Sequence, residues 1–122
     1  MNFICSKQKL QEGISIVTKA ITGKTTMPIL EGIYIEANNE GVTLIGSDMD
    51  VSIETKVEAT VITPGKIVLD ARLFGEIIRK LPNSDVKIEI ADNDLIQVTC
   101  EKSVFNLVYM NPSDYPMLPT IN

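Results

Sequence analysis

The chain contains no histidine at any of its 122 positions. Histidine is the commonest general base near neutral pH and the commonest metal ligand, so this absence removes support for most acid-base and metal chemistry. Neither cysteine, Cys5 or Cys100, has a histidine to activate it as a nucleophile. The sequence therefore predicts a non-catalytic protein with no catalytic residue, no cofactor and no metal site.

Long apolar runs are also missing. No hydrophobic stretch reaches the length needed to span a bilayer. The N-terminus, MNFICSKQKL, is too short and too polar for a secretory signal. Cys5 and Cys100 lie in apolar strand patterns, which is typical of buried free thiols. These features predict a cytoplasmic protein without a membrane partner.

The balance of charge is acidic: 16 acidic and 11 basic residues give a net charge of −5. This argues against a general nucleic-acid binder with a basic surface. The two signs are nevertheless separated along the chain. Acids cluster at 36–40, 48–58 and 85–101. Several bases lie in or beside two predicted helices: Lys7, Lys9, Lys19, Lys24, Arg72, Arg79 and Lys80. This pattern predicts one positive face on a negative body.

The same order of elements, a strand, a helix and three strands, occurs twice along the chain. The first pass runs from Met1 to about Ala59 and the second from about Gly65 to Met110. Apolar residues at helical spacing predict one helix in each pass, and alternating apolar residues predict the strands. The predicted helices are residues 7–20 and 71–81, and the predicted strands are residues 1–5, 29–37, 42–46, 51–57, 66–69, 86–91, 95–101 and 104–109.

These elements predict an α+β fold with eight mainly antiparallel strands and two helices packed on one side. Asp70 is the predicted N-cap of the second helix, and Pro82 is expected to end it. Residues 111–122 contain three prolines and are predicted to form an extended exit segment or linker. The length of the chain, residues 1–122, fits a single domain.

The faces of the two helices carry the informative chemistry. On the second helix, Arg72 and Arg79 fall opposite the apolar stripe, with the acid Glu76 to one flank. The predicted stripe consists of Leu73, Phe74, Ile77, Ile78 and Leu81. The first helix is expected to bury Leu10, Ile14 and Val17, and to point outward Gln8, Glu12, Ser15 and Lys19. Two arginines on one outer face favour contact with a polyanion, and an ordinary solvated face is the alternative.

Paired acids offer a second candidate site. Asp48 and Asp50 flank Met49, and Asp92 and Asp94 flank Asn93. Such pairs could hold a hard cation, but Asp and Asn more often bond to the local backbone in turns. A small enzyme that uses Asp48 and Asp50 with a divalent metal is therefore a weakly supported alternative.

Several segments carry a family resemblance. Residues 24–32, KTTMPILEG, resemble the loop-and-strand signature of the bacterial replicative sliding clamp, the beta subunit of the DNA polymerase III holoenzyme. Residues 46–50, GSDMD, are similar to the Gly-Thr-Asp-Leu-Glu segment of this family. Residues 64–82 resemble its second-helix region. Residues 105–107 and 111–119, including the Asp-Tyr-Pro at 114–116, resemble the end of its first domain. The resemblance covers the whole chain in order, and the chain looks like the first of the family's three domains.

The resemblance implies a ring in which two three-domain protomers close head to tail around double-stranded DNA. Helices would line the inner wall and sheets would form the outside. It also implies a DNA polymerase processivity factor that encircles duplex DNA without sequence specificity and tethers the replicative polymerase. DNA polymerase III and the clamp loader would bind through domains that this chain does not contain.

The resemblance also assigns site residues. Lys24 and Arg72 match positions that contact DNA in the family, where position 24 is often arginine. Lysine keeps the charge but loses the bidentate fork. Arg79 is added here from the helical wheel. Phe105 and Leu107 match an apolar patch on the edge strand that meets the neighbouring protomer, and core packing is the alternative for both residues. The alternative function is a protein-interaction module that binds partners through an exposed sheet edge.

Overall fold

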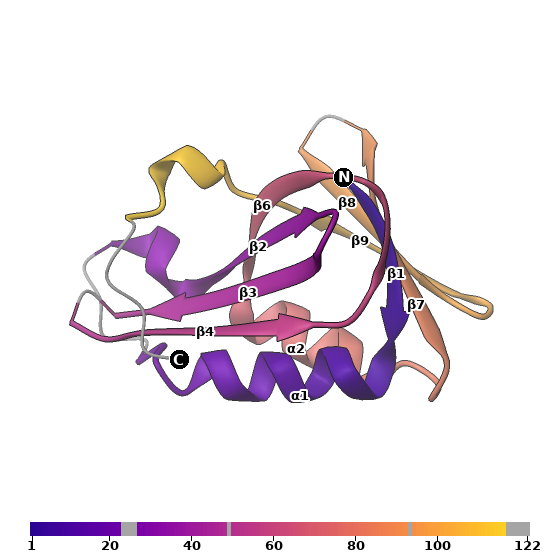
Figure 1. The fold of residues 1–122 in the computed structure, drawn as a ribbon, viewed down its shortest axis with the longest axis horizontal. Helices are drawn as coiled ribbons and strands as arrows, with labels where there is room; N and C mark the ends of the chain where they lie inside the picture. The colour runs from indigo at the N-terminus through magenta and orange to yellow at the C-terminus, as the bar shows by residue number, and fades with distance from the viewer. Residues whose placement is uncertain (23–26, 49, 93, 117–122) are drawn as a thin grey trace.

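The computed structural model describes residues 1–22, 27–48, 50–92 and 94–116, which form two α-helices, nine strands and two short 3-10 helices (Figure 1). The first pass contains β1 (Asn2–Ser6), α1 (Lys7–Thr18), η1 (Pro28–Glu31), β2 (Gly32–Asn38), β3 (Gly41–Ser47) and β4 (Ser52–Val57). It is followed by β5 (Thr60–Thr63). The second pass contains β6 (Gly65–Asp70), α2 (Ala71–Lys80), β7 (Asp85–Asp92), β8 (Leu95–Cys100), β9 (Ser103–Val108) and η2 (Pro112–Asp114).

The strands form two antiparallel sheets. The five-stranded sheet has the order β5-β1-β7-β8-β9, and the four-stranded sheet has the order β4-β3-β2-β6. Each pass therefore gives its first strand to the sheet that holds the last three strands of the other pass. The two helices lie side by side in the lower part of Figure 1. Both contact the four-stranded sheet, and α1 also contacts β1 of the five-stranded sheet.

The predicted α+β fold class is confirmed, with one strand more than the eight predicted. The ninth strand is β5, which follows β4 after two residues and pairs with β1 in the other sheet. Its burial pattern explains why sequence periodicity did not reveal it. Only Val61 of this strand packs against the core, and the other three residues are exposed.

A side chain caps the N-terminus of each helix, and one of these two caps was predicted from the sequence. The Asp70 carboxylate accepts a hydrogen bond from the Leu73 amide at 2.9 Å, so the predicted N-cap of α2 is confirmed. The Ser6 hydroxyl accepts one from the Lys9 amide at 3.1 Å and caps α1. The first helix ends at Thr18 and the second at Lys80, each slightly before its predicted end.

The main hydrophobic core lies between the helices and the two sheets, and it takes residues from both passes. Its largest fully buried side chains include Phe3, Leu10 and Phe74. One residue of the predicted apolar stripe is misplaced: Leu73 is 47% exposed. Ala71, two residues earlier, is buried instead. The buried stripe of α2 is therefore rotated toward α1 relative to the stripe predicted from the sequence.

A smaller apolar cluster covers one end of the outer face of the four-stranded sheet. Here the rings of Tyr34 and Tyr115 are 5.4 Å apart. Two backbone hydrogen bonds between Val68 and Met110 attach the segment after β9 to β6. Burial raises the pKa of Tyr115 to about 12. The segment expected to be extended therefore contains a 3-10 turn and a buried tyrosine within residues 111–116, whereas residues 117–122 lie outside the described part.

Within the described residues, no helix has the length and apolar character required to cross a bilayer.

Two glycines provide a matched test of helix packing. A Cβ atom at Gly46 on β3 would overlap the Val17 carbonyl oxygen of α1, because the helix lies directly against this strand. A Cβ atom at Gly75 on α2 would have Ile14 Cγ2 as its neighbour at an ordinary 3.7 Å. We expect Gly46→Ala to reduce the free energy of unfolding by about 2–3 kcal/mol. We expect Gly75→Ala to increase it by about 0.5–1 kcal/mol through helix propensity. Urea denaturation measures both values, and equal effects would contradict this packing.

The reactivity of the two cysteine thiols tests whether both are buried in the core. Cys5 and Cys100 are 4% and 1% exposed, and burial followed by the nearby Asp85 charge raises the pKa of Cys5 to about 12. We expect neither thiol to react with Ellman's reagent at pH 8 in the native protein, and both to react in denaturant. A Ser15→Cys variant, which places a thiol on the exposed face of α1, serves as the reactive control. Rapid labelling of the native wild-type chain would contradict the predicted burial.

Candidate nucleic-acid interface

The outer faces of α1 and α2 form one continuous surface. A shallow groove runs between the helices and is lined from the α1 side by Gln11, Ile14, Ser15 and Thr18. The α2 side contributes Ala71, Arg72, Gly75, Glu76 and Arg79. The groove combines neutral hydrogen-bonding groups on α1 with charged groups on α2, which is a suitable arrangement for contacting phosphate oxygens.

The structure brings Arg72 and Arg79 to the same groove, as the helical wheel predicted. Both residues are exposed, and the side chain of Arg72 is 91% exposed. Glu76 was predicted on the flank of this face but lies on the face itself. Its Oε1 atom is 3.7 Å from Nε of Arg72, and it also lines the groove beside Arg79. The net charge of the groove is therefore positive, but smaller than the +2 of the two arginines alone.

Two lysines of the predicted positive face are engaged elsewhere. The Lys7 ammonium donates hydrogen bonds to the carbonyl oxygens of Arg79 at 3.0 Å and Leu81 at 2.6 Å. It thereby satisfies carbonyls at the C-terminus of α2, where a positive charge is favourable. Lys9 lies 3.3 Å from the carboxylate of Glu58, in the segment between β4 and β5. Lys7 thus links the two helices, and Lys9 links α1 to the segment between β4 and β5.

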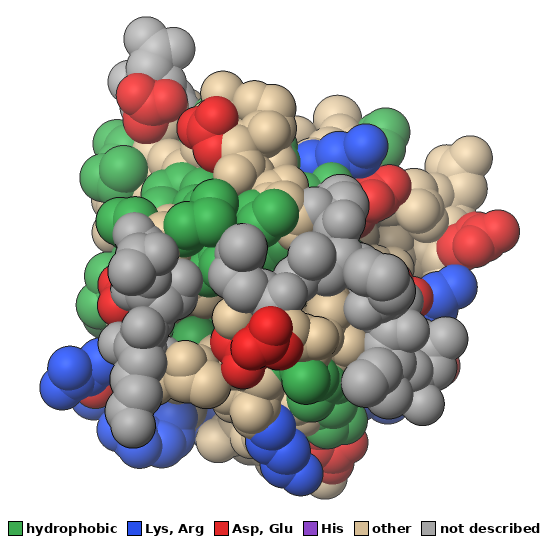
Figure 2. All heavy atoms as spheres, turned by 90° about the vertical axis from the view of Figure 1, so that its left-hand side faces the viewer, with side chains coloured by type: hydrophobic (Ala, Val, Ile, Leu, Met, Phe, Trp, Pro, Cys, Tyr) green, Lys and Arg blue, Asp and Glu red, His purple; other side chains and the backbone are tan. Residues whose placement is uncertain are grey.

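The remaining bases predicted for the positive face that the structure describes are Lys19, Arg72, Arg79 and Lys80, and all four are exposed. Figure 2 shows Lys and Arg side chains along the lower margin of one face, on the side where α1 and α2 lie in Figure 1. Other exposed lysines lie on β4, on β6 and in the β8–β9 turn, so the separate positive face stays a prediction.

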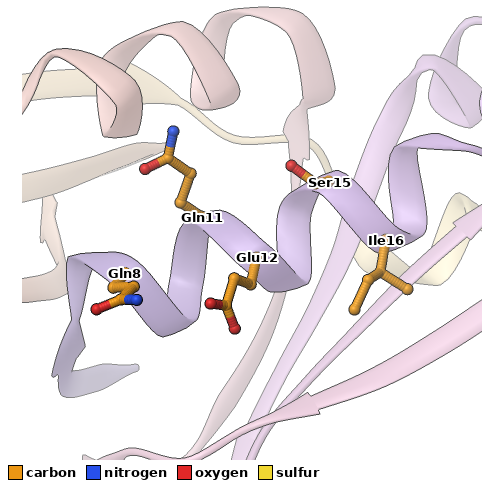
Figure 3. A pocket seen from close by; sticks show the side chains of 5 residues that line it. All are labelled: Gln8, Gln11, Glu12, Ser15 and Ile16. Atoms are coloured by element: carbon orange, nitrogen blue, oxygen red, sulfur yellow. The ribbon is translucent and has the colours of Figure 1, made fainter.

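The outward side of α1 is mostly neutral. Figure 3 shows Gln8, Gln11, Glu12, Ser15 and Ile16 around a shallow hollow on this helix. Gln11 and Ser15 lie on the side nearer α2, whereas Glu12 and Ile16 point the other way. Gln11 was not among the residues predicted to point outward, although its position four residues before Ser15 places the two on one face. Ile16, which is 41% exposed, was not predicted to be exposed either.

Lys24, the third predicted DNA-binding residue, lies outside the described residues. The segment before it ends beside Arg72. A hollow there is lined by Ile21, Thr22, Glu31, Asp70, Ala71 and Arg72. Arg72 therefore borders two neighbouring hollows of the helical surface.

The two residues predicted at a ring interface lie on β9, the last strand of the five-stranded sheet. This strand pairs with β8 on one side only. Phe105 and Leu107 share one face, as predicted, and lie opposite the buried Val98 and Ile96. Phe105 is 36% exposed because it lies at the sheet edge, whereas Leu107 is 6% exposed and belongs to the main core. Of the two, Phe105 offers side-chain surface to a neighbour.

The acidic pair at residues 48–50 has a local explanation. The Asp48 carboxylate accepts hydrogen bonds from the amides of Val51 at 2.8 Å and Asp50 at 3.0 Å. These bonds lower the pKa of Asp48, and they are typical of a turn. In the part of the chain that the structure describes, no three His, Cys, Asp or Glu residues gather as a metal site. The turn interpretation of Asp48 is confirmed.

Comparison with known sequences identifies relatives along nearly the whole chain. A family model described as the DNA polymerase III beta subunit, N-terminal domain, matches residues 1–119. The chain is 40% identical to the beta sliding clamp of Halalkalibacterium halodurans, over 99% of this chain and 34% of that protein. It is 42% identical to the beta sliding clamp of Bacillus subtilis over the same shares. The chain thus spans 34% of the length of both relatives.

Solved structures agree. The DNA polymerase sliding clamp from Bacillus subtilis is similar with a TM-score of 0.93 and 42% identity, over 99% of this chain and 34% of that chain. The beta subunit from the DNA polymerase of Streptococcus pyogenes is similar with a TM-score of 0.93 and 29% identity, over 100% of this chain and 33% of that chain. The family resemblance noted in the sequence is therefore confirmed. This chain belongs to the DNA polymerase III beta subunit family and corresponds to its N-terminal domain.

Proposed function

We propose that this chain is the first of three domains of a ring-shaped sliding clamp. The ring encircles duplex DNA without sequence specificity and tethers the replicative polymerase as a processivity factor. The observation that carries this proposal is the groove between α1 and α2, where Arg72 and Arg79 lie on the exposed side of a helix pair backed by two sheets. Membership in the beta subunit family supports the same role.

The mechanism follows from the weakness of the contacts. Lys24, Arg72 and Arg79 give at most three phosphate contacts per domain, so the salt slope of DNA binding is about −2 to −3. Such contacts do not hold DNA by affinity. Phosphate contacts also carry no sequence information, so they allow the protein to move along the duplex. Closure of the ring provides the retention, and the net charge of −5 discourages DNA binding elsewhere on the surface.

The ring is completed by other copies and domains. We assign Phe105 and Leu107 to the contact with the neighbouring protomer of a head-to-tail dimer, with Phe105 as the exposed member and Leu107 as its support from the core. DNA polymerase III and the clamp loader bind through domains outside this chain. The role is non-catalytic. The location is cytoplasmic, where free thiols such as Cys5 and Cys100 remain reduced.

A second candidate function uses the same edge strand. In the part of the chain that the structure describes, no strand pairs with the outer side of β9, and such an edge can accept an extended peptide. A protein-interaction module would therefore use β9 without any nucleic acid. Titration with duplex DNA at low salt, followed by NMR chemical shifts, separates the two. Changes on α1 and α2 favour the clamp, and changes confined to residues 104–109 favour the module.

The arginines give the first functional test. We expect the Arg72→Ala, Arg79→Ala double variant to bind a short duplex more weakly and to reduce the magnitude of the salt slope by about two. NMR titration of this chain at several low salt concentrations measures both quantities. The control is Lys66→Ala with Lys102→Ala, which removes the same charge from exposed sites on β6 and the β8–β9 turn. Equal losses in both double variants would exclude the helical face as the DNA contact.

The edge strand gives the second test. In a three-domain protein that contains this chain, we expect Phe105→Asp to weaken ring dimerisation at least about ten-fold, because a charge would enter an apolar contact. Sedimentation analysis measures the monomer–dimer equilibrium. Asn106→Asp adds the same charge on the opposite, exposed face of β9 and is the control. An unchanged Phe105→Asp dimer, or equal disruption by both variants, would argue against the assigned interface.

A further inference from the structure

An acidic residue lies within the groove of the proposed DNA-binding face. Arg72, Glu76 and Arg79 follow one another at a spacing of four and three residues, which places all three along one side of α2. All three line the groove with α1. Glu76 Oε1 lies 3.7 Å from Arg72 Nε, so the sequence of charges along the groove is positive, negative, positive.

The position of Glu76 is not explained by the stability of the fold. Its side chain is 44% exposed and its partner is 91% exposed, and loose surface pairs of this kind contribute little to stability. The N-terminus of α2 already has its cap in Asp70, and the C-terminal carbonyls have Lys7. The carboxylate of Glu76 therefore acts mainly on the electrostatics of the groove.

Glu76 acts in two ways on a phosphate that approaches this groove. The carboxylate repels the phosphate, and it already occupies the Nε side of the Arg72 guanidinium. The other guanidinium nitrogens of Arg72 remain available for contact. Glu76 therefore weakens the contact without blocking it. Across the groove, Gln11, Ser15 and Thr18 add hydrogen-bonding groups but no compensating charge.

We infer that Glu76 attenuates phosphate binding by Arg72 and Arg79 and so keeps each contact between this domain and DNA weak. The inference rests on the proposed function, because it concerns the same surface and the same ligand. It assigns a role to an acid on the inner face that opposes binding. In a ring that retains DNA by enclosure, weak contacts lower the barrier to movement from one phosphate to the next.

The test is Glu76→Gln in this chain, titrated by NMR with a short DNA duplex at low salt. We expect binding to become about two- to three-fold tighter, and the salt slope to become steeper by up to about one, because one more cationic charge is free to contact phosphate. In a background of Arg72→Ala, most of this gain should disappear, since the two residues act as a pair.

Glu12→Gln is the matched control. Glu12 is exposed on the outer side of α1, so its removal changes the net charge equally without releasing an arginine of the groove. We expect a clearly smaller gain for this variant. A gain for Glu76→Gln no larger than that for Glu12→Gln, or one that persists without Arg72, would overturn the inference. The Arg72→Ala, Arg79→Ala variant tests the proposed function separately. An absence of binding by every variant, Glu76→Gln included, would overturn the inference alone, because a closed ring retains DNA without affinity of this domain.

Discussion

The exchange of first strands between the two repeats is the constraint on which the rest of the structure depends. β1 leaves its own repeat and lies between β5 and β7, and β6 pairs with β2. Each exchanged strand runs directly into its helix, at Ser6 and at Asp70. Because each repeat gives its first strand to the sheet of the other repeat, the two helices that follow these strands lie side by side. As a result, a duplicated sequence forms one two-helix surface and one shared core.

That surface shows how local arrangement outweighs total charge. The protein carries five more negative than positive charges, yet the groove between its helices contains two arginines and one acid. The two helices also differ in kind. In the groove, α1 presents one amide and two hydroxyls, and α2 presents ions. A polyanion would meet hydrogen-bonding groups from one helix and charge from the other, which suits contacts with a regular backbone of phosphates.

Much of this organisation could be predicted from the sequence. Periodicity and capping are local signals, so the two helices, eight strands and the Asp70 cap were predicted within a few residues. Resemblance to a family provided the expected ring and the matched site residues Lys24, Arg72, Phe105 and Leu107. The exposed side of α2 followed from helical geometry because Arg72 and Arg79 are two turns apart.

The failures have physical causes that lie beyond local pattern. Leu73 is at the border of an apolar stripe, where the tilt of the helix against its neighbours decides burial. β5 has a single residue on the core, so it has no period to detect. Lys7 was counted as part of the positive face, but its partners are carbonyls 72 and 74 residues away. Contacts of that separation depend on the tertiary fold, which charge counts along a chain do not contain.

The Lys7 contacts also bear on the order in which the chain acquires its structure. The ammonium at the beginning of the first helix completes the end of a helix that is synthesised much later. β1, immediately before it, likewise finds both of its neighbours in later segments. The N-terminal half therefore leaves the ribosome without the partners that its first strand and first helix require. Folding of this domain can therefore be completed only after the second repeat has emerged, because its first strand and first helix depend on contacts of long sequence separation.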